Sequence, residues 1–367
     1  MRVAGIMTGT SVDAIDIATC EIESKGDRHT VSLLSFTSSP FPDDLRELIH
    51  SCLAGTASLQ EVSDLPFELA RGYAAALENH WSAHAITPEL VAVHGQTIWH
   101  HPPVSTWQAG SGPALSALVN LPVVSDFRSA DVALGGQGAP LVPVFDHAVY
   151  GAADRNRVAL NIGGMANMTV LMAGGPIETL TAFDCGPGNV WMDHAARVTY
   201  GKSYDTNGSI ARAGRVLKPM LAEMMSMPFF AMDPPKSTGR ELFTTQELKR
   251  LVTKYSHPSS PLEDVLTTVT ELTAWCIVDH LQRYASGCHE VVTSGGGSQN
   301  GFLIERIAEL SKELGAAWIV TVDPLWAEKE AMAFAYLGWR TVNGLPGNVP
   351  SVTGASRFAV LGTIARA

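Results

Sequence analysis

A pattern that occurs twice in the chain constrains the fold most strongly. Residues 3–6 form an apolar stretch, residues 8–13 a turn of small and polar side chains, and residues 15–20 resume as strand-like sequence. Three later stretches repeat this order, at residues 158–162, 163–164 and 168–172. Strand-like alternation follows each turn, where a dinucleotide-binding turn would open a helix, so each pattern predicts a β-hairpin with a glycine-containing turn.

The elements predicted after each hairpin also share one order. In the first half, strands are predicted at residues 31–36, 90–93 and 122–124. A helical stretch follows each of them, at residues 42–84, at 112–119 and in a third helix that ends near 150. In the second half, strands are predicted at residues 178–183, 290–293 and 317–322, and helical stretches follow them at residues 188–285, 302–314 and 328–341. The order βββαβαβα, given twice, predicts two α/β domains at residues 1–150 and 151–367, with a cleft between them and a helical insertion at about 200–260.

This duplicated order resembles the plan of the actin, Hsp70 and hexokinase superfamily, whose domains are ribonuclease H-like. The resemblance implies that ATP and Mg²⁺ bind in the cleft and that the domains close on their ligands. The chain contains no P-loop sequence and no well-placed G-x-G-x-x-G, so the two commonest nucleotide motifs are excluded.

Composition and charge exclude several classes of protein. Charged residues make up 17% of the 367 and hydrophobic residues 46%, which are values of a folded globular chain. The formal net charge of −11 gives no basic field for a nucleic acid, and no apolar run reaches the ~18 residues of a membrane helix. We therefore expect neither a nucleic acid nor a membrane as a partner.

Cysteine usage and the amino terminus indicate the compartment. The five cysteines are an odd number, and no two stand in a C-x-x-C pair, which favours reduced and mostly buried thiols. The first residues form no signal-peptide apolar core. We therefore expect a cytoplasmic protein.

Glycine-rich turns at three places suit a nucleotide. In the first, residues 9–11 offer backbone and hydroxyl donors, and Asp13 and Asp16 have the chemistry to hold a water-clad Mg²⁺. Gly163 and Gly164 form the second turn, and residues 295–297 are three successive glycines after a predicted strand. A tight turn without a ligand uses the same residue types, but three such turns together favour a nucleotide site.

Two carboxylates are candidates for the chemistry. Asp184 is predicted to end a strand beside free backbone amides, a position that suits a general base, with an N-cap aspartate as the alternative. Glu330 falls on the small and apolar stripe of a predicted helix, which would place its carboxylate on the buried face. A buried carboxylate needs a partner or a function, and an ion pair with a core arginine is the alternative.

Short polar side chains follow two predicted strands. His94 and Gln96 come after residues 90–93, and a second set comes after residues 122–124, namely Arg128, Asp131 and Gln137. Open α/β sheets bind ligands at the carboxyl ends of their strands, and these side chains suit sugar hydroxyls. Loops are rich in such residues in any protein, so the density at two strand ends is what favours a sugar site.

Seven motifs in the chain resemble those of the anhydro-N-acetylmuramic acid kinase family. They lie in family order at residues 5–16, 94–98, 135–141, 161–164, 183–189, 294–297 and 330–335. Ala14 stands where the family usually has glycine, which would alter the first turn if that position requires a positive φ.

The resemblance implies a reaction and its residues. Water would open the 1,6-anhydro bridge of anhydro-N-acetylmuramic acid while ATP phosphorylates O6, with Asp184 activating the water and Glu330 beside it. The ATP contacts would be Gly9, Thr10, Ser11, Val12, Asp13, Ala14, Ile15, Asp16, Gly163, Gly164, Asn167, Gly295, Gly296 and Gly297, with Mg²⁺ at Asp13 and Asp16. The sugar contacts would be His94, Gln96, Arg128, Asp131, Gln137, Gly186 and Asn189.

By the same resemblance we expect a homodimer that recycles cell-wall sugars. A kinase for another 1,6-anhydro sugar, such as levoglucosan, is a close alternative. An ATPase of the same superfamily that is not a kinase is a second alternative, from a different functional class.

Overall fold

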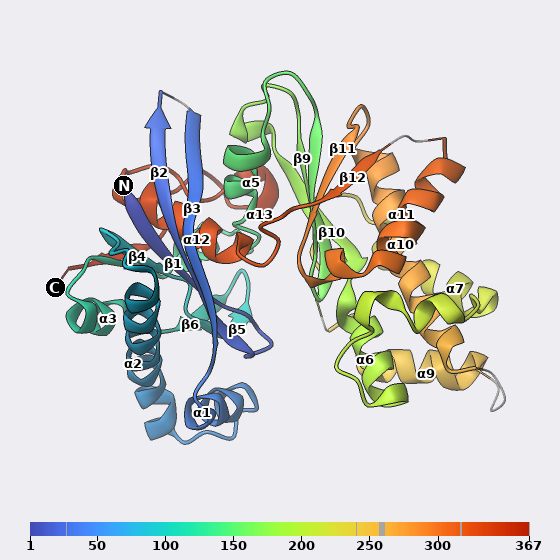
Figure 1. Cartoon of the computed structure of the whole chain (residues 1–367), viewed down its shortest axis with the longest axis horizontal. Coiled ribbons are helices and arrows are strands. Elements are labelled where there is room, and N and C mark those ends of the chain that lie inside the picture. Colours follow the sequence, from blue (N-terminus) through green and yellow to red (C-terminus); the bar gives the residue numbers. More distant parts are fainter. Residues whose placement is uncertain (27, 240, 257–260, 316–317, 367) are drawn as a thin grey trace. The chain divides into compact units, whose positions relative to one another are not determined.

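The computed structural model describes residues 1–26, 28–239, 241–256, 261–315 and 318–366 (Figure 1). The chain divides into two compact units, which are described separately. The first unit contains Met1–Val149, Ile177–Thr179 and Glu328–Ala367, and the second contains Tyr150–Pro176 and Leu180–Ala327.

The first unit is built on a six-stranded sheet in the order β13-β7-β4-β1-β2-β3. Its strands are β1 (Arg2–Thr8), β2 (Ala14–Lys25), β3 (Arg28–Pro40), β4 (Leu90–Val93), β7 (Val123–Ser125) and β13 (Thr363–Ala365). β1 pairs antiparallel with β2, with Gly5 opposite Ala18, and parallel with β4. Strand β13 and the separate hairpin of β5 (Gln96–His101) and β6 (Ser105–Ala109) were not predicted from the sequence.

Helices of the first unit cover this sheet. They are α1 (Asp43–Leu53), α2 (Leu59–His84), α3 (Gly112–Val119), α4 (Ser129–Ala133), α5 (Pro143–Tyr150), α12 (Lys329–Val342) and α13 (Pro350–Thr353), with the 3₁₀ turn η1 (Ile177–Thr179). A capping box of Ser58 and Glu61 opens α2, which satisfies two of the amide groups that a helix start leaves unpaired. Leu65, Leu69 and Leu77 of α2 then pack into the core that the sheet supplies.

The second unit has a five-stranded sheet in the order β10-β9-β8-β11-β12. Its strands are β8 (Arg157–Ile162), β9 (Met165–Leu171), β10 (Thr181–Pro187), β11 (Glu290–Ser294) and β12 (Ile319–Val322). Its helices are α6 (Asn189–Tyr200), α7 (Lys218–Met225), α8 (Pro228–Ala231), α9 (Thr245–Tyr255), α10 (Glu263–Tyr284) and α11 (Gly301–Glu313), with 3₁₀ turns η2 (Thr206–Gly208), η3 (Ala211–Ala213) and η4 (Gly296–Gln299). Residues 240 and 257–260 of the predicted insertion lie outside the described residues.

The two sheets repeat one topology. Strands β3-β2-β1-β4-β7 and β10-β9-β8-β11-β12 stand in the same order along their sheets, and each begins with an antiparallel hairpin, β1–β2 or β8–β9. The predicted fold class of duplicated actin-like α/β units is therefore confirmed. Among the helices of the described residues, none is both long enough and apolar enough to cross a membrane.

The carboxyl-terminal segment belongs to the first unit, whereas the sequence-based division assigned it to a domain of residues 151–367. α12 packs on β1 so closely that a Cβ at Gly5 would lie 2.0 Å from the Ala331 carbonyl oxygen. A Cβ at Gly338 would likewise lie 2.4 Å from that of Ala92 on β4. The apolar face of α12 thus fits the first sheet, and chain order alone gives no sign of which sheet a helix covers.

Candidate active site

The turn between β1 and β2 is closed by its own backbone. The Val12 amide donates to the Gly9 carbonyl oxygen at 3.2 Å. Val12 has a φ of 59° and a side chain only 1% exposed, so a β-branched residue is held in the left-handed region by its burial. Ala14 instead opens β2 opposite Pro40 of β3, without a positive φ, so this departure from the family's glycine does not strain the turn.

Asp16 lies among other carboxylates of the first unit, whereas Asp13 is exposed on the turn. Desolvation raises the pKa of Asp16, a hydrogen bond from Ser38 lowers it, and the Glu328 carboxylate raises it again. Asp16 in turn raises the pKa of Glu330. In the part of the chain that the structure describes, no group of three or more His, Cys, Asp and Glu side chains is arranged to hold a metal ion.

The prediction that Glu330 faces the core is wrong. α12 begins at Lys329, so Glu330 lies in its first turn with an exposed side chain, and the buried stripe starts at Ala331. The buried charge there is Lys329, whose Nζ lies 2.8 Å from Asp146 Oδ1. The side chain of Glu330 keeps accessible surface, but the surrounding protein partly desolvates its carboxylate. This desolvation raises the pKa of Glu330, and the Lys329 charge lowers it.

His94 and Arg128, predicted from separate loops, are brought together. The Nε and Nη2 atoms of Arg128 donate to His94 Nε2 at 3.1 and 2.9 Å. Burial lowers the pKa of His94 well below its ordinary value, so the ring is neutral and accepts these bonds. Desolvation lowers the pKa of Arg128 to about 10, which leaves it charged at neutral pH, and Glu330 raises it. The Phe334 ring of α12 packs on the ring of His94, with centroids 4.6 Å apart.

Gln96 connects the predicted sugar loop to the first hairpin turn. It is the first residue of β5 and not part of a loop, and its Nε2 donates to the Gly9 carbonyl oxygen at 3.2 Å. Its Oε1 atom is buried and has no partner among the described residues. One end of this amide therefore supports the turn, while the other keeps the capacity to accept a hydrogen bond.

Asp131 is fully buried and holds its own loop together. Its Oδ2 accepts from the Gly138 amide, and its Oδ1 accepts from Asn348 Nδ2 and Thr353 Oγ1, each at 2.7 Å. Next to it, the Gln137 amide donates to the Thr353 carbonyl oxygen at 2.8 Å while the Gln137 side chain is exposed. These bonds favour a positioning function for Asp131 and leave Gln137 free to reach a ligand.

The β8–β9 turn of the second unit is backed by the start of α6. The Asn189 amide donates to the Gly163 carbonyl oxygen at 2.7 Å, and Asn189 Nδ2 donates to the Ile162 carbonyl oxygen at 3.3 Å. A Cβ at Gly164 would meet nothing within 4 Å, so the outer side of this turn is open. Asn167 stands on β9 opposite Asp184 on β10.

The three glycines at 295–297 have different surroundings. A Cβ at Gly297 would lie 2.3 Å from Ile162 Cγ2, and one at Gly295, whose φ is 79°, would lie 2.6 Å from Asn161 Oδ1. A Cβ at Gly296 would meet only Asn189 Nδ2, at an ordinary 3.7 Å. The outer two glycines therefore allow close packing against β8, while Gly296 faces open space.

Asp184 lies inside β10, not at the end of a strand as predicted, where a bulge interrupts the register between Asp184 and Gly186. Its amide donates to the Lys236 carbonyl oxygen at 3.1 Å, and its Oδ2 accepts from the Thr238 amide at 2.8 Å. Burial raises the pKa of Asp184 to about 6, against the lowering effects of Thr238 and Lys236. A Cβ at Gly186 would lie 2.7 Å from Phe230 Cε1, so this glycine is needed for packing.

The segment that holds Asp184 was missed by the sequence analysis. Residues 234–239 read Pro-Pro-Lys-Ser-Thr-Gly, a composition rich in turn-forming residues that signals a loop but no partner. The predicted site residues are thus divided: residues 9–16, 94, 96, 128, 131, 137 and 330 lie in the first unit, and residues 163, 164, 167, 184, 186, 189 and 295–297 lie in the second.

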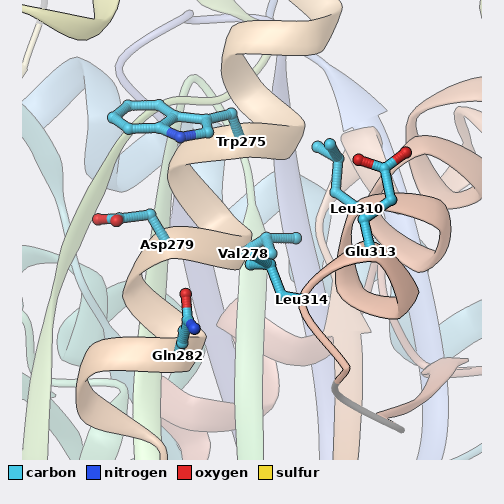
Figure 2. A pocket seen from close by; sticks show the side chains of 7 residues that line it. All are labelled: Trp275, Val278, Asp279, Gln282, Leu310, Glu313 and Leu314. Atoms are coloured by element: carbon cyan, nitrogen blue, oxygen red, sulfur yellow. The ribbon is translucent and has the colours of Figure 1, made fainter.

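A surface groove of about 280 Å³ lies elsewhere on the second unit, between α10 and α11 (Figure 2). Its lining residues are Trp275, Val278, Asp279, Gln282, Leu310, Glu313 and Leu314. None of the predicted site residues is among them, so this groove is not the candidate active site.

Several solved structures are similar to the chain at low identity. The ROK hexokinase from Thermus thermophilus is 14% identical over 93% of this chain and 100% of its own, with a TM-score of 0.41. A ROK family glucokinase from Streptomyces griseus, in complex with glucose and AMPPNP, is 13% identical over 93% and 100%, with a TM-score of 0.43. Component A of (R)-2-hydroxyglutaryl-CoA dehydratase from Acidaminococcus fermentans is 12% identical over 94% and 99%, with a TM-score of 0.48.

The assignment rests on the comparison with protein families. Residues 1–367 match the family described as Anhydro-N-acetylmuramic acid kinase. The match covers the whole chain and confirms the resemblance that the seven motifs indicated. This chain is therefore an enzyme that belongs to the anhydro-N-acetylmuramic acid kinase family.

Proposed function

We propose that the protein opens the 1,6-anhydro bridge of anhydro-N-acetylmuramic acid with water and transfers the γ-phosphoryl group of ATP to O6. The product is N-acetylmuramic acid 6-phosphate, formed in the cytoplasm during recycling of cell-wall sugars by a homodimer. The family match supports kinase activity. The observation that carries the hydrolytic step is Asp184: its carboxylate accepts a hydrogen bond from the Thr238 amide, and burial raises its pKa to about 6.

Asp184 has the properties of a general base for water. A base is most effective when its pKa lies near the working pH, and an ordinary aspartate at 3.8 is a weaker proton acceptor than one near 6. A water oxygen bonds to C1 and passes its proton to Asp184, while the bond between C1 and the bridge oxygen breaks. The released O6 bonds to the γ-phosphorus and ADP leaves, so the atoms and charges balance.

The open glycines fit a nucleotide. Gly164 and Gly296 leave room outside the backbone, and a Cβ at Gly9 would meet only Ser11 Oγ, at 3.6 Å. Backbone amides at such turns approach phosphate oxygens closely because no side chain intervenes. We therefore assign the phosphates and the ring of ATP to these turns.

Asp13 and Asp16 are the residues that would hold Mg²⁺. Mg²⁺ binds through one or two carboxylates, waters and substrate phosphates, so it needs no complete protein cage. When bound, it would offset the negative charge of the phosphates. Desolvation raises the pKa values of Asp16 and Glu330; the Glu328 carboxylate adds to the rise for Asp16, and the Asp16 carboxylate adds to the rise for Glu330.

The sugar contacts in the first unit are assigned to Arg128, His94, Gln96 and the exposed Gln137. Among the described residues, no carboxylate lies within salt-bridge distance of Arg128, so its charge remains available for an anionic group. Asp131, Gly186 and Asn189 use their contacts within the protein, and we assign them to positioning the loops that carry the sugar.

The test is a turnover assay in ¹⁸O-water with a panel of anhydro sugars. We expect ATP-dependent turnover of anhydro-N-acetylmuramic acid, with the label at C1 of the product and none in the phosphate. Preference for levoglucosan would change the substrate but keep the chemistry. ATP hydrolysis that does not depend on a sugar, with label in the phosphate, would identify an ATPase and contradict the proposal.

A further inference from the structure

The segment of Lys236, Ser237 and Thr238, named here the Asp184 clasp, holds Asp184 on two sides. The Lys236 carbonyl oxygen accepts from the Asp184 amide at 3.1 Å, and the Thr238 amide donates to Asp184 Oδ2 at 2.8 Å. The clasp has no regular secondary structure of its own. Something else must therefore fix it against β10.

Lys236 is the residue of the clasp that enters the protein interior. It is only 6% exposed, its Nζ donates to the Phe229 carbonyl oxygen at 3.2 Å, and the same Nζ lies 4.6 Å from the centre of the Phe229 ring. In the described part of the chain, no carboxylate lies within salt-bridge distance of this ammonium group. Burial of a charge without a paired counter-ion costs several kcal/mol, a cost that a loop residue with no function would avoid.

We propose that Lys236 is a positioning residue for Asp184: its buried side chain anchors the clasp that holds the Asp184 carboxylate in place. This inference rests on the proposed general-base function of Asp184. It extends that function to a residue to which the sequence motifs gave no function.

The groups that surround this pair determine the electrostatic effect. The Glu241 carboxylate raises the pKa of Asp184, and the Lys236 charge lowers it. Burial lowers the pKa of Lys236, and the Arg283 charge lowers it further, while the Asp279 carboxylate raises it. His280 is also close, but burial lowers its pKa to about 4, and burial raises the pKa of the Cys185 and Cys276 thiols, so these three groups add no charge at neutral pH.

The test compares Lys236→Met with Lys236→Arg and with Lys249→Met, an exposed lysine on α9 of the same unit. The acid limb of the kcat profile, which reports Asp184, should move upward by about one pH unit in Lys236→Met, because an opposite charge near a carboxylate is removed. At pH values below this shifted limb, the turnover of Lys236→Met should fall by up to about tenfold, and it should recover at higher pH. Lys236→Arg and Lys249→Met should keep the wild-type limb, and KM for ATP should not change.

Three outcomes would overturn the inference. One is a folded Lys236→Met enzyme with an unchanged pH profile. Another is an equal loss of kcat at every pH, which a purely structural function would give. The third is failure of Lys236→Met and Lys236→Gln to fold while Lys236→Arg folds. A wild-type enzyme without turnover of any anhydro sugar would instead contradict the proposed function, so the two failures are distinguishable.

Discussion

The two units share a strand order but hold their polar groups in different ways. In the first unit the predicted ligand residues bind one another: Arg128 donates to His94, and Gln96 donates to the backbone of the β1–β2 turn. In the second unit a single carboxylate, Asp184, is held by the backbone of a loop. The repeated sheet thus determines where strand ends and turns lie, while the chemistry at each position comes from side chains that the repeat does not share.

The hairpin turns show the same contrast on a smaller scale. The first turn contains a buried Val12 at a φ of 59° and two acidic residues nearby, whereas the second turn has glycines and is braced by Asn189. A strained, acidic turn suits a cation and an open glycine turn suits a phosphate. The two turns therefore differ in chemistry although they occupy equivalent positions in the repeat.

The largest expected effect is that of Asp184→Asn in the second unit. Asparagine keeps an oxygen to accept from the Thr238 amide but cannot take a proton, so turnover should fall by about 10²–10⁴-fold. Calorimetry with an ATP analogue should give unchanged affinity. Near-normal turnover would show that Asp184 is not the general base, and that the second unit does not differ from the first by a catalytic carboxylate at this position.

The next effect separates glycines that face a ligand from glycines that face the protein. Gly296→Val and Gly164→Val should weaken ATP binding by at least about tenfold without lowering Tm, because their added atoms enter open space. Gly297→Ala should instead lower Tm, because its Cβ meets Ile162 at 2.3 Å. Unchanged ATP affinity in both valine variants would exclude these turns from the nucleotide site.

Local sequence was sufficient for the hairpins and for their turns, because alternation and glycine content act over a few residues. It was not sufficient for α12, whose position on the first sheet depends on the match of Gly5 to Ala331, over 300 residues away. The start of α12 was predicted to within one residue, but a stripe of small residues does not show that the side chain of Glu330 in the first turn stays exposed. The Asp184 clasp was missed because two backbone bonds from an irregular loop leave no side-chain pattern.

A smaller effect distinguishes positioning from binding in the first unit. Asp131→Ala removes the acceptor of three hydrogen bonds and leaves buried donors unpaired, which should cost roughly 3 kcal/mol of unfolding free energy. Urea denaturation measures this loss, with the exposed Asp64→Ala on α2 as the control. A stable Asp131→Ala protein with a raised KM for the sugar would show that Asp131 binds the ligand directly.

The ionisation of Asp184 should also be visible in the stability of the protein. Its pKa is raised from 3.8 to about 6, so the folded state binds a proton more tightly, and stability falls as pH rises through this window. The loss amounts to at most ~3 kcal/mol. Tm of Asp184→Asn relative to wild type should therefore increase between pH 4 and pH 7, and a constant difference would contradict the raised pKa.

The smallest expected effect concerns Ala14, beside the strained turn of the first unit. Ala14 opens β2 opposite Pro40 of β3 without a positive φ, so a glycine there gains nothing from its freedom in the folded state and loses more entropy on folding. Ala14→Gly should therefore lower stability by roughly 0.5–1 kcal/mol and leave ATP affinity unchanged. Thermal unfolding and calorimetry on the same variant measure the two quantities. A gain in ATP affinity would mean that the turn rearranges when the nucleotide binds, and that position 14 then adopts a conformation that alanine resists.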